Sequence, residues 1–253
     1  MSEEHPLFEF DPDPVGVLDQ WVALAGERDS IPARAVLCFY AEILEALPAE
    51  AEQIGTLEAA HGLHPIWKVD RYGVDVAVFH PGVGAPLAAA FLEEAIVMGA
   101  RSVVACGGCG TLSADVGPGD IVVPTVAVRD EGTSYHYLPR SRTVDADPEG
   151  VSAAVALLEE RGIPFTTGKV WTTDAIYRET RQKVDRREAE GCLVVEMEAA
   201  AFFAVARFRG IRFAQLLYGG DDLSGAEWDS RGWTVSPSRK LTFDLAVELA
   251  SRL

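Results

Sequence analysis

Two groups of acidic residues stand where the sequence predicts strands to end. Glu196, Met197 and Glu198 directly follow a short apolar run, and Asp221 follows the next apolar run along the chain. In open α/β sheets, ligands bind outside the carboxyl ends of the strands. Carboxyl groups placed there can accept hydrogen bonds from hydroxyls, stabilise developing positive charge or donate a proton to a leaving group. Taken alone, each glutamate is equally compatible with an acid in the first turn of the helix predicted next.

Together, the two groups resemble motifs of the nucleoside phosphorylase and nucleosidase superfamily. Its members include purine nucleoside phosphorylase, uridine phosphorylase and methylthioadenosine/S-adenosylhomocysteine nucleosidase. In that superfamily a Glu-Met-Glu run holds the ribose, and a strand ending in Ser-Asp supplies the acid that protonates a purine base. The resemblance therefore implies that Glu196, Met197 and Glu198 bind ribose. Either Asp221 or Asp222 could be the catalytic acid, and the match to the family favours Asp221, with Gly220 in place of the usual serine. The resemblance also implies a homo-oligomer, either a dimer or a hexamer.

Two further segments resemble the base-binding parts of the superfamily. Cys109 and Gly110 match a Gly-Thr-Cys-Gly turn that approaches the base and sugar. Tyr177 matches an aromatic residue that stacks on the nucleoside, and Ile176 replaces its phenylalanine neighbour. A redox or zinc role for the Cys-x-x-Cys that ends at Cys109 is a less favoured interpretation. A zinc site needs about four ligands, and the other two cysteines of the chain stand alone.

The segments that bind phosphate in the phosphorylases are altered in this sequence. The first predicted strand ends in Cys-Phe-Tyr-Ala-Glu instead of Gly-Asp-Pro-x-Arg, and Ala105 and Gly108 replace an arginine and a hydroxyl residue. Losing two charge-assisted contacts would cost about 3–6 kcal/mol of phosphate binding. Arg129 and Arg231 are the replacement cations that we consider, although nothing in the sequence aims them at the site.

Glu42 suggests that water, rather than phosphate, is the nucleophile. Hydrolytic members of the superfamily carry a glutamate after the first strand that positions water, and Glu42 lies within about one residue of that place. This makes Glu42 a catalytic base by resemblance. The interpretation of Glu42 as an ordinary acid in the first turn of a helix is slightly favoured.

The resemblance predicts cleavage of the N-glycosidic bond of a small-molecule nucleoside. Phosphorolysis is the default of the family, with phosphate as co-substrate and with no cofactor and no metal. Hydrolysis is the alternative because the usual phosphate-binding arginines are missing, and a catalytically inactive nucleoside-binding module is a further alternative. A purine-like base is expected, because the Gln-x-Arg with which uridine enzymes read uracil is not recognisable.

Composition limits the partners of the chain. Its 253 residues carry a net charge of −17, which argues against nucleic acid and anionic membrane surfaces, since both require a basic footprint. The acidic start resembles no secretory signal, and no apolar run reaches the ~18 residues of a membrane span. Four cysteines in a chain of this length favour a reducing, cytoplasmic setting over a disulfide scaffold.

Hydrophobic periodicity predicts a single α/β domain over residues 1–253, with a central mixed sheet flanked by helices and an irregular arm at 1–14. A short helix is expected at 15–25 and helical spacing at 42–47, at 49–57 and in the charged segment 178–190. We expect strands near 35–40, 74–80, 102–106, 120–128, 168–173, 192–195 and 213–218. We expect the other helices near 85–99, 149–161, 196–209 and 237–252.

Overall fold

The computed structural model describes residues 5–18, 23–47, 51–231 and 236–253. The strands are β1 Arg34–Cys38, β2 Glu52–Ala59, β3 Gly62–Arg71, β4 Val74–Phe79, β5 Ser102–Thr111, β6 Ile121–Asp130, β7 Thr143–Asp145, β8 Phe165–Thr173, β9 Cys192–Glu196 and β10 Arg212–Asp222. The α-helices are α2 Ala41–Ala46, α3 Ala85–Met98, α4 Pro148–Glu160, α5 Arg181–Ala189, α6 Ala199–Arg209 and α7 Ser236–Arg252. The predicted strands and the helices outside 15–25 and 49–57 are therefore present, with ends that shift by a few residues.

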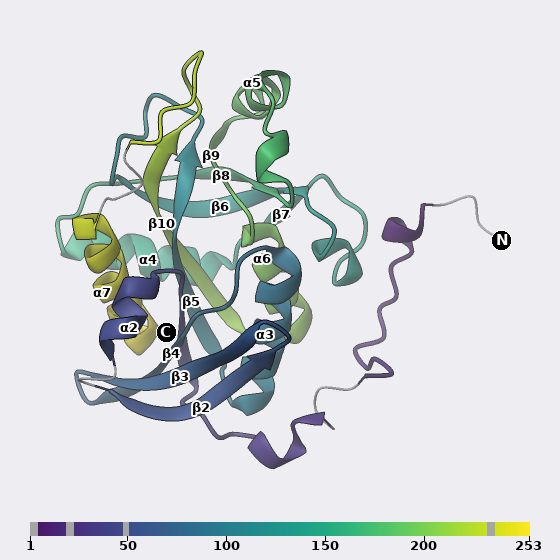
Figure 1. Ribbon diagram of the computed structural model, residues 1–253, viewed down its shortest axis with the longest axis vertical. Coiled ribbons are helices and arrows are strands. Elements are labelled where there is room, and N and C mark those ends of the chain that lie inside the picture. Colours follow the sequence, from purple (N-terminus) through teal and green to yellow (C-terminus); the bar gives the residue numbers. More distant parts are fainter. Residues whose placement is uncertain (1–4, 19–22, 48–50, 232–235) are drawn as a thin grey trace.

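These strands of the described residues form one mixed sheet in the order β10-β6-β8-β9-β5-β1-β4-β3-β2, and β7 pairs with β6 beside this path (Figure 1). β1 pairs in parallel with both β4 and β5, whereas β3 runs antiparallel to both of its neighbours, β2 and β4. β10 pairs with β5 as well as with β6, so β5, β10, β6, β8 and β9 close into a ring. The predicted mixed α/β sheet is confirmed.

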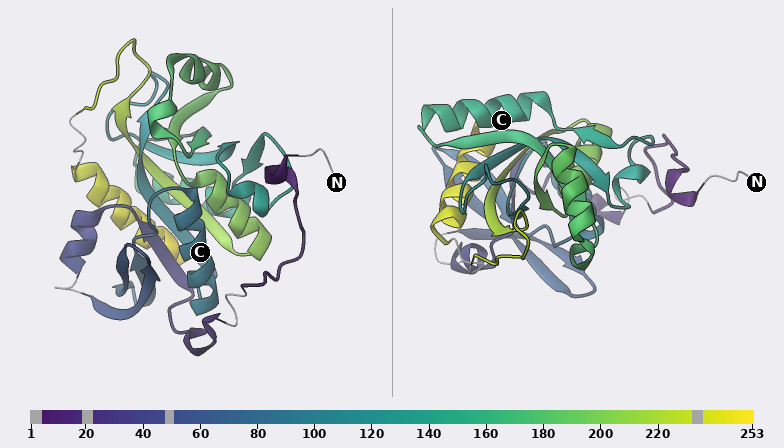
Figure 2. Two further views of the ribbon diagram at one scale, coloured as in Figure 1. Left: turned by 45° about the vertical axis from the view of Figure 1, so that its right-hand side comes forward. Right: turned by 90° about the horizontal axis from the view of Figure 1, so that it is seen from above.

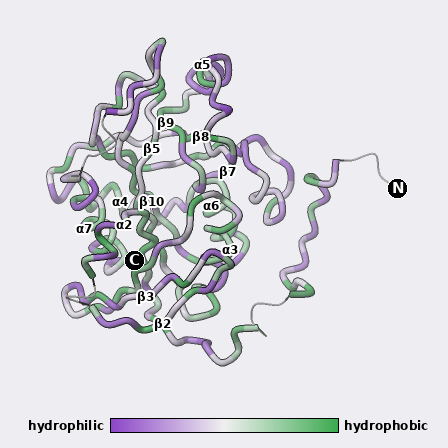
Figure 3. Tube along the Cα trace, in the orientation of Figure 1, coloured by the Kyte–Doolittle hydropathy of each residue, from purple (hydrophilic) through white to green (hydrophobic). Residues whose placement is uncertain are grey.

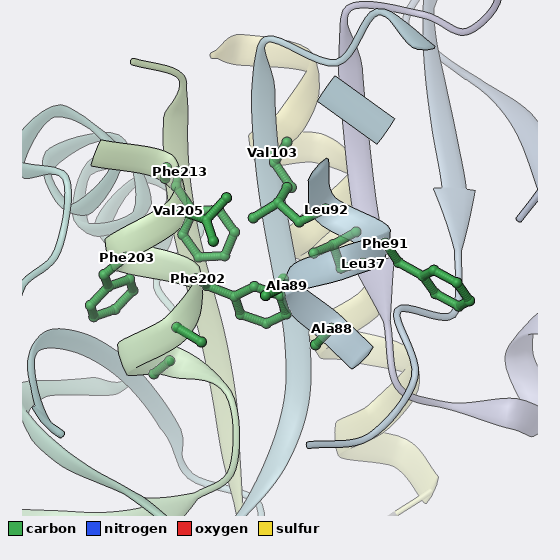
Figure 4. Packing of buried hydrophobic residues seen from close by; sticks show 14 of the residues in the cluster. Leu37, Ala88, Ala89, Phe91, Leu92, Val103, Phe202, Phe203, Val205 and Phe213 are labelled. Atoms are coloured by element: carbon green, nitrogen blue, oxygen red, sulfur yellow. The ribbon is translucent and has the colours of Figure 1, made fainter. Parts of the chain in front are cut away.

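Helices cover both faces of the central strands, which explains why those strands are almost wholly apolar. Leu37 of β1 packs in one cluster with α3 and α6, and the adjacent Val36 packs in a second cluster with α4 and α7. Figure 4 shows side chains of α3 and α6 meeting over β1, β5 and β10, where the rings of Phe202 and Phe213 lie 5.2 Å apart. In Figure 3 the central strands are hydrophobic, and the charged α5 at the periphery is largely hydrophilic.

Helical spacing at 49–57 was misleading. The described part of this segment forms β2, which pairs with β3 in an antiparallel hairpin that places Leu57 opposite His64. β3 in turn pairs along β4, so the hairpin extends the sheet and buries Leu57. Pairing with an existing sheet edge outweighed the weak helical pattern. β3 itself was not predicted, because Pro65 interrupts its apolar pattern and proline is typical of turns and strand edges.

The glycine-rich segment after Cys106 is strand rather than turn. β5 continues to Thr111 because β10 lies beside it, with Leu217 opposite Gly107 and Tyr218 opposite Gly108. Backbone pairing with β10 therefore supplies the hydrogen bonds that a turn would otherwise have to find. β10 likewise runs on through Asp222 instead of ending at Tyr218.

The N-terminal segment lies along the outside of the molecule (Figures 1 and 2). Residues 5–18 contain a single 3-10 turn, Pro6–Phe8, and the ring of Phe8 contacts Tyr135 edge-on. The predicted helix at 15–25 falls partly outside the described residues. In its described part, residues 15–18 are not helical, Ala23 is α-helical, and Ala25–Glu27 forms a 3-10 turn. No helix in the described ranges is long and apolar enough to cross a membrane.

Candidate active site

A cavity of about 250 Å³ opens at the carboxyl ends of β5, β9 and β10. All the predicted site residues except Glu42 and Tyr177 line it: Cys109, Gly110, Ile176, Glu196, Met197, Glu198 and Asp221. The tyrosine lies outside the cavity with 95% of its surface exposed. The fold therefore brings the acids of two consecutive strands to one cavity, because β9 and β10 both pair with the carboxyl-terminal part of β5, in opposite directions.

Glu196 is fixed in place at the end of β9. One carboxylate oxygen accepts a hydrogen bond from the Thr172 hydroxyl at 2.5 Å, and the other accepts backbone N–H groups of Glu198 and Ala199 at 2.7 and 2.6 Å. Burial raises the pKa of Glu196, and these three hydrogen bonds oppose the rise. The two backbone donors belong to the N-cap Glu198 and the first residue of α6, so the Glu196 carboxylate satisfies N–H groups at the start of this helix and orients the backbone at Glu198.

Glu198 is the more weakly bound acid of the pair. It is 7% exposed, and one of its oxygens accepts the backbone N–H of Gly84 at 2.6 Å. Burial and the negative charge of Glu196 raise its pKa above the ordinary range of glutamate. Gly84 has a φ of 89°, a conformation that favours glycine. The glycine-rich turn after β4 thus directs a backbone donor at a carboxylate.

Asp221 and Asp222 lie in different surroundings, although they are neighbours. Asp221 lines the cavity, and one of its oxygens accepts the indole N–H of Trp228 at 2.7 Å. Asp222 does not line it and pairs with Arg231 at 2.7 Å. Burial opposes the shift, but hydrogen bonds from Ser224 hold the pKa of Asp222 below its usual range. The geometry therefore makes Asp221 the acid that a ligand would meet.

The backbone at Gly110 passes close to side chains of the site. A Cβ atom there would lie 2.6 Å from Leu223 and 3.3 Å from a carboxylate oxygen of Asp221. Beside it, the buried thiol of Cys109 donates to the carbonyl of Tyr218 at 3.2 Å. Burial raises the pKa of that thiol well above its ordinary value, so the group stays protonated and unreactive. Among the described residues, no cluster of three or more His, Cys, Asp or Glu could hold a metal.

Glu179 is a fourth acid of the cavity that the sequence analysis missed. Burial, with the negative charge of Asp221, raises its pKa to about 7. Its position just before the charged helix α5 concealed it, because runs of charge usually mark a solvated face. Ile176, on the same short segment, lies at the mouth of the cavity with its side chain exposed.

Arg239 is the other residue that the sequence analysis missed. It reaches the cavity from α7 and is the only Lys, Arg or His among the described lining residues. Its Nε donates to the Tyr218 hydroxyl at 2.8 Å, and its Nη1 donates to Glu42 at 3.0 Å. Glu42 is thus connected to the cavity through Arg239 without lining it.

The two arginines considered as replacement cations lie elsewhere. Arg129 is buried and donates to the hydroxyls of Ser134 and Ser141 and to the carbonyl of Pro139, at 2.7–2.8 Å. Arg231 pairs with Asp222, as described above. Neither lines the cavity, so neither is placed to meet a ligand there.

Comparisons with known proteins show the family to which the chain belongs. The chain is 36% identical over 140 residues to guanosine phosphorylase of Halorubrum lacusprofundi, an alignment that covers 55% of this chain and 58% of that protein. It is 27% identical to a DeoD-type purine nucleoside phosphorylase of Haemophilus ducreyi, over 82% of this chain and 84% of the relative. The crystal structure of Toxoplasma gondii purine nucleoside phosphorylase in complex with immucillin-H has the same fold. It superposes with a TM-score of 0.75 at 20% identity, over 88% of this chain and 92% of that one. The phosphorylase superfamily model matches residues 34–252, and the chain therefore belongs to the phosphorylase superfamily.

Proposed function

We propose that this protein cleaves the N-glycosidic bond of purine nucleosides by phosphorolysis. The observation that carries the proposal is that Glu198 and Asp221 line one cavity from the ends of β9 and β10. Relatives named for guanosine and purine nucleoside phosphorolysis support the reaction type. Phosphate is the co-substrate, and the proposed reaction needs no other cofactor.

The chemistry divides between the two ends of the cavity. As the C1′–N bond breaks, its electron pair moves to the base and positive charge develops on the ribose. Glu198 accepts hydrogen bonds from the ribose hydroxyls and stabilises that charge, Glu196 holds the backbone before it in place, and Met197 contacts the sugar. Asp221 donates a proton to a ring nitrogen of the departing purine. A phosphate oxygen then bonds to C1′, which gives ribose 1-phosphate and the free base.

Hydrolysis with Glu42 as base is the weaker candidate. Glu42 does not line the cavity. Although burial opposes it, the hydrogen bond from Arg239 holds the pKa of Glu42 below its usual range. A general base works best with a pKa near the operating pH, so an ion-paired glutamate with a lowered pKa is poorly suited to activate water.

The deciding experiment measures both products from a panel of purine and pyrimidine nucleosides, with and without phosphate. We expect free purine base and ribose 1-phosphate, and we expect both to require added phosphate. Free ribose at the same rate in phosphate-free buffer, lost in Glu42→Gln, would replace phosphorolysis by hydrolysis. Raised thermal stability with nucleoside but no turnover would identify an inactive binding module instead.

We also propose that copies of the chain associate, as the family resemblance implies. Val83, Ile176 and Tyr177 are large apolar or aromatic side chains exposed at or beside the mouth of the cavity. Burying such side chains against another copy would be favourable, because interface cores are enriched in apolar and aromatic groups. Light scattering at micromolar concentration tests this, and a monomer would contradict it.

A further inference from the structure

Charge is distributed unevenly along the cavity. Four acids line it, namely Glu179, Glu196, Glu198 and Asp221. Arg239 is the one cation among the described lining residues, and the protein as a whole carries a net charge of −17. An anionic co-substrate would be repelled by the acids. Within the described cavity, Arg239 therefore marks the place where an anion is favoured.

The position of Arg239 relates it to the altered phosphate segments of the sequence. A Cβ atom at Gly108 would lie 3.1 Å from the Tyr218 hydroxyl oxygen, and that hydroxyl accepts the Nε–H of Arg239 at 2.8 Å. Gly108 is where the family resemblance places a phosphate-binding hydroxyl residue. The hydroxyl of Tyr218 and the guanidinium of Arg239 thus stand against the wall from which the usual phosphate ligands have been lost.

We propose that Arg239 on the C-terminal helix is the phosphate-binding cation of this enzyme and that Tyr218 positions it. The inference rests on the proposed phosphorolysis and names the residue that holds its co-substrate. A guanidinium matches the geometry of phosphate oxygens through its planar fork of donors. The segments that resemble the family's phosphate site therefore need no arginine of their own. Arg239 on α7, a distant part of the chain, supplies the positive charge.

Glu42 competes with phosphate in this arrangement. It pairs with Arg239 at 3.0 Å, and its side chain is 48% exposed. A half-exposed ion pair contributes little to stability, so the carboxylate can be displaced into solvent when phosphate binds. Glu42 then limits the affinity for phosphate, whereas Arg239 provides it.

The test compares Arg239→Ala, Arg239→Lys and Glu42→Gln in steady-state kinetics, with phosphate and a purine nucleoside varied separately. We expect Arg239→Ala to raise KM for phosphate about 10- to 150-fold, the effect of losing one charge-assisted contact, and to leave KM for the nucleoside within about twofold. Arg239→Lys keeps the charge and loses the fork, so its increase should be smaller.

Glu42→Gln separates this role from a structural one. Removing the competing carboxylate should lower KM for phosphate, whereas loss of a merely structural ion pair would damage both variants in the same direction. Arg252→Ala is the matched control, because Arg252 lies on the same helix and pairs with Glu160 at 2.7 Å, away from the cavity. It should leave KM for phosphate unchanged. If Arg239→Ala fails to fold, Arg239→Lys and Glu42→Gln still decide the question.

Several outcomes would overturn the assignment. If turnover of Arg239→Ala still requires phosphate with an unchanged KM, Arg239 is not the phosphate ligand, although the proposed phosphorolysis survives. A second set of assays uses a nucleoside 5′-monophosphate as the substrate. If Arg239→Ala raises KM for that nucleotide and not for phosphate, the guanidinium binds the phosphate of a substrate instead. Phosphate-independent release of free ribose by the wild type would instead remove the proposed phosphorolysis itself.

Discussion

Glu198→Gln tests the sugar end of the cavity. The side chain is nearly isosteric, and its amide oxygen can still accept the backbone N–H of Gly84, which lies 2.6 Å from the carboxylate. The amide nitrogen, however, is a donor and cannot accept a ribose hydroxyl. The substitution therefore removes an acceptor from the sugar while it preserves the shape of the buried site.

The size of the effect follows from the kind of hydrogen bond lost. Burial and the charge of Glu196 raise the pKa of Glu198 to about 8, so the assay is run above that pH, where Glu198 is ionised. A hydrogen bond to a charged group contributes about 1.5–3 kcal/mol, which corresponds to about 10- to 150-fold in kcat/KM. We expect the wild type to prefer a purine ribonucleoside over its 2′-deoxy counterpart by that factor. In Glu198→Gln the preference should fall to about threefold or less, because the 2′-hydroxyl then has no carboxylate to meet.

The assay measures kcat/KM of the wild type and of Glu198→Gln with the ribonucleoside and with its 2′-deoxy counterpart, at saturating phosphate. The four values form a double-mutant-type cycle. Glu94→Gln is the matched control: Glu94 is a half-buried acid that does not line the cavity, and burial raises its pKa too. It should leave the preference unchanged. If Glu198→Gln slows both substrates by the same factor, Glu198 does not contact the 2′-hydroxyl, and the proposed ribose site is wrong.

Three further predictions concern the acids of the cavity. Burial, with the charge of Glu196, raises the pKa of Glu198 above 4.5, so the folded protein keeps a proton that the unfolded chain releases. The free energy of unfolding of the wild type should therefore fall relative to that of Glu198→Gln as pH rises from about 5 to about 8. A difference in free energy of unfolding between the two proteins that stays constant over this range would contradict this. Asp221→Asn should slow release of purine base about 10²-fold or more, and an unimpaired variant would refute the assignment of the acid. Because burial, with the charge of Asp221, raises the pKa of Glu179 to about 7, Glu179→Gln should remove a step near that pH from the kcat/KM profile. An unaltered profile would show that Glu179 does not act on the reaction.

The sequence predicted the acid-bearing end of the cavity for a local reason. The strands before Glu196 and Asp221 are short apolar runs buried between helices, and such runs are easily recognised. The strands themselves are not adjacent, because β10 pairs with β5 in parallel and β9 pairs with β5 antiparallel. Their acids meet because both strands pair with the same end of β5, which no local pattern shows. The different roles of Glu196 and Glu198 depend on their hydrogen-bond donors, Thr172 and Gly84. These donors are distant in the sequence, so no local pattern predicts the contacts.

The cationic end could not be predicted in this way. The pairing of Arg239 with Glu42 joins residues 197 positions apart, and it exists because α7 packs on β1 and β5. Periodicity places an arginine on a helix but does not say which strand ends the helix passes. The two cations that the sequence offers near the known motifs, Arg129 and Arg231, are held by other partners.

The spacing along β5 connects the two ends of the cavity. Gly108 faces Tyr218 and, through it, Arg239, while Gly110 faces Asp221. These glycines are two residues apart on one strand, so they share a face and lie about 7 Å from each other. Reacting atoms in a productive complex approach to about 3–3.5 Å, so this span suits a sugar carbon with an attacking oxygen on one side and a departing base on the other. A Cβ atom at Gly108 would press on the Tyr218 side chain, and one at Gly110 would press on Leu223 and Asp221. The glycines of β5 therefore keep the groups at both ends of the proposed site in place.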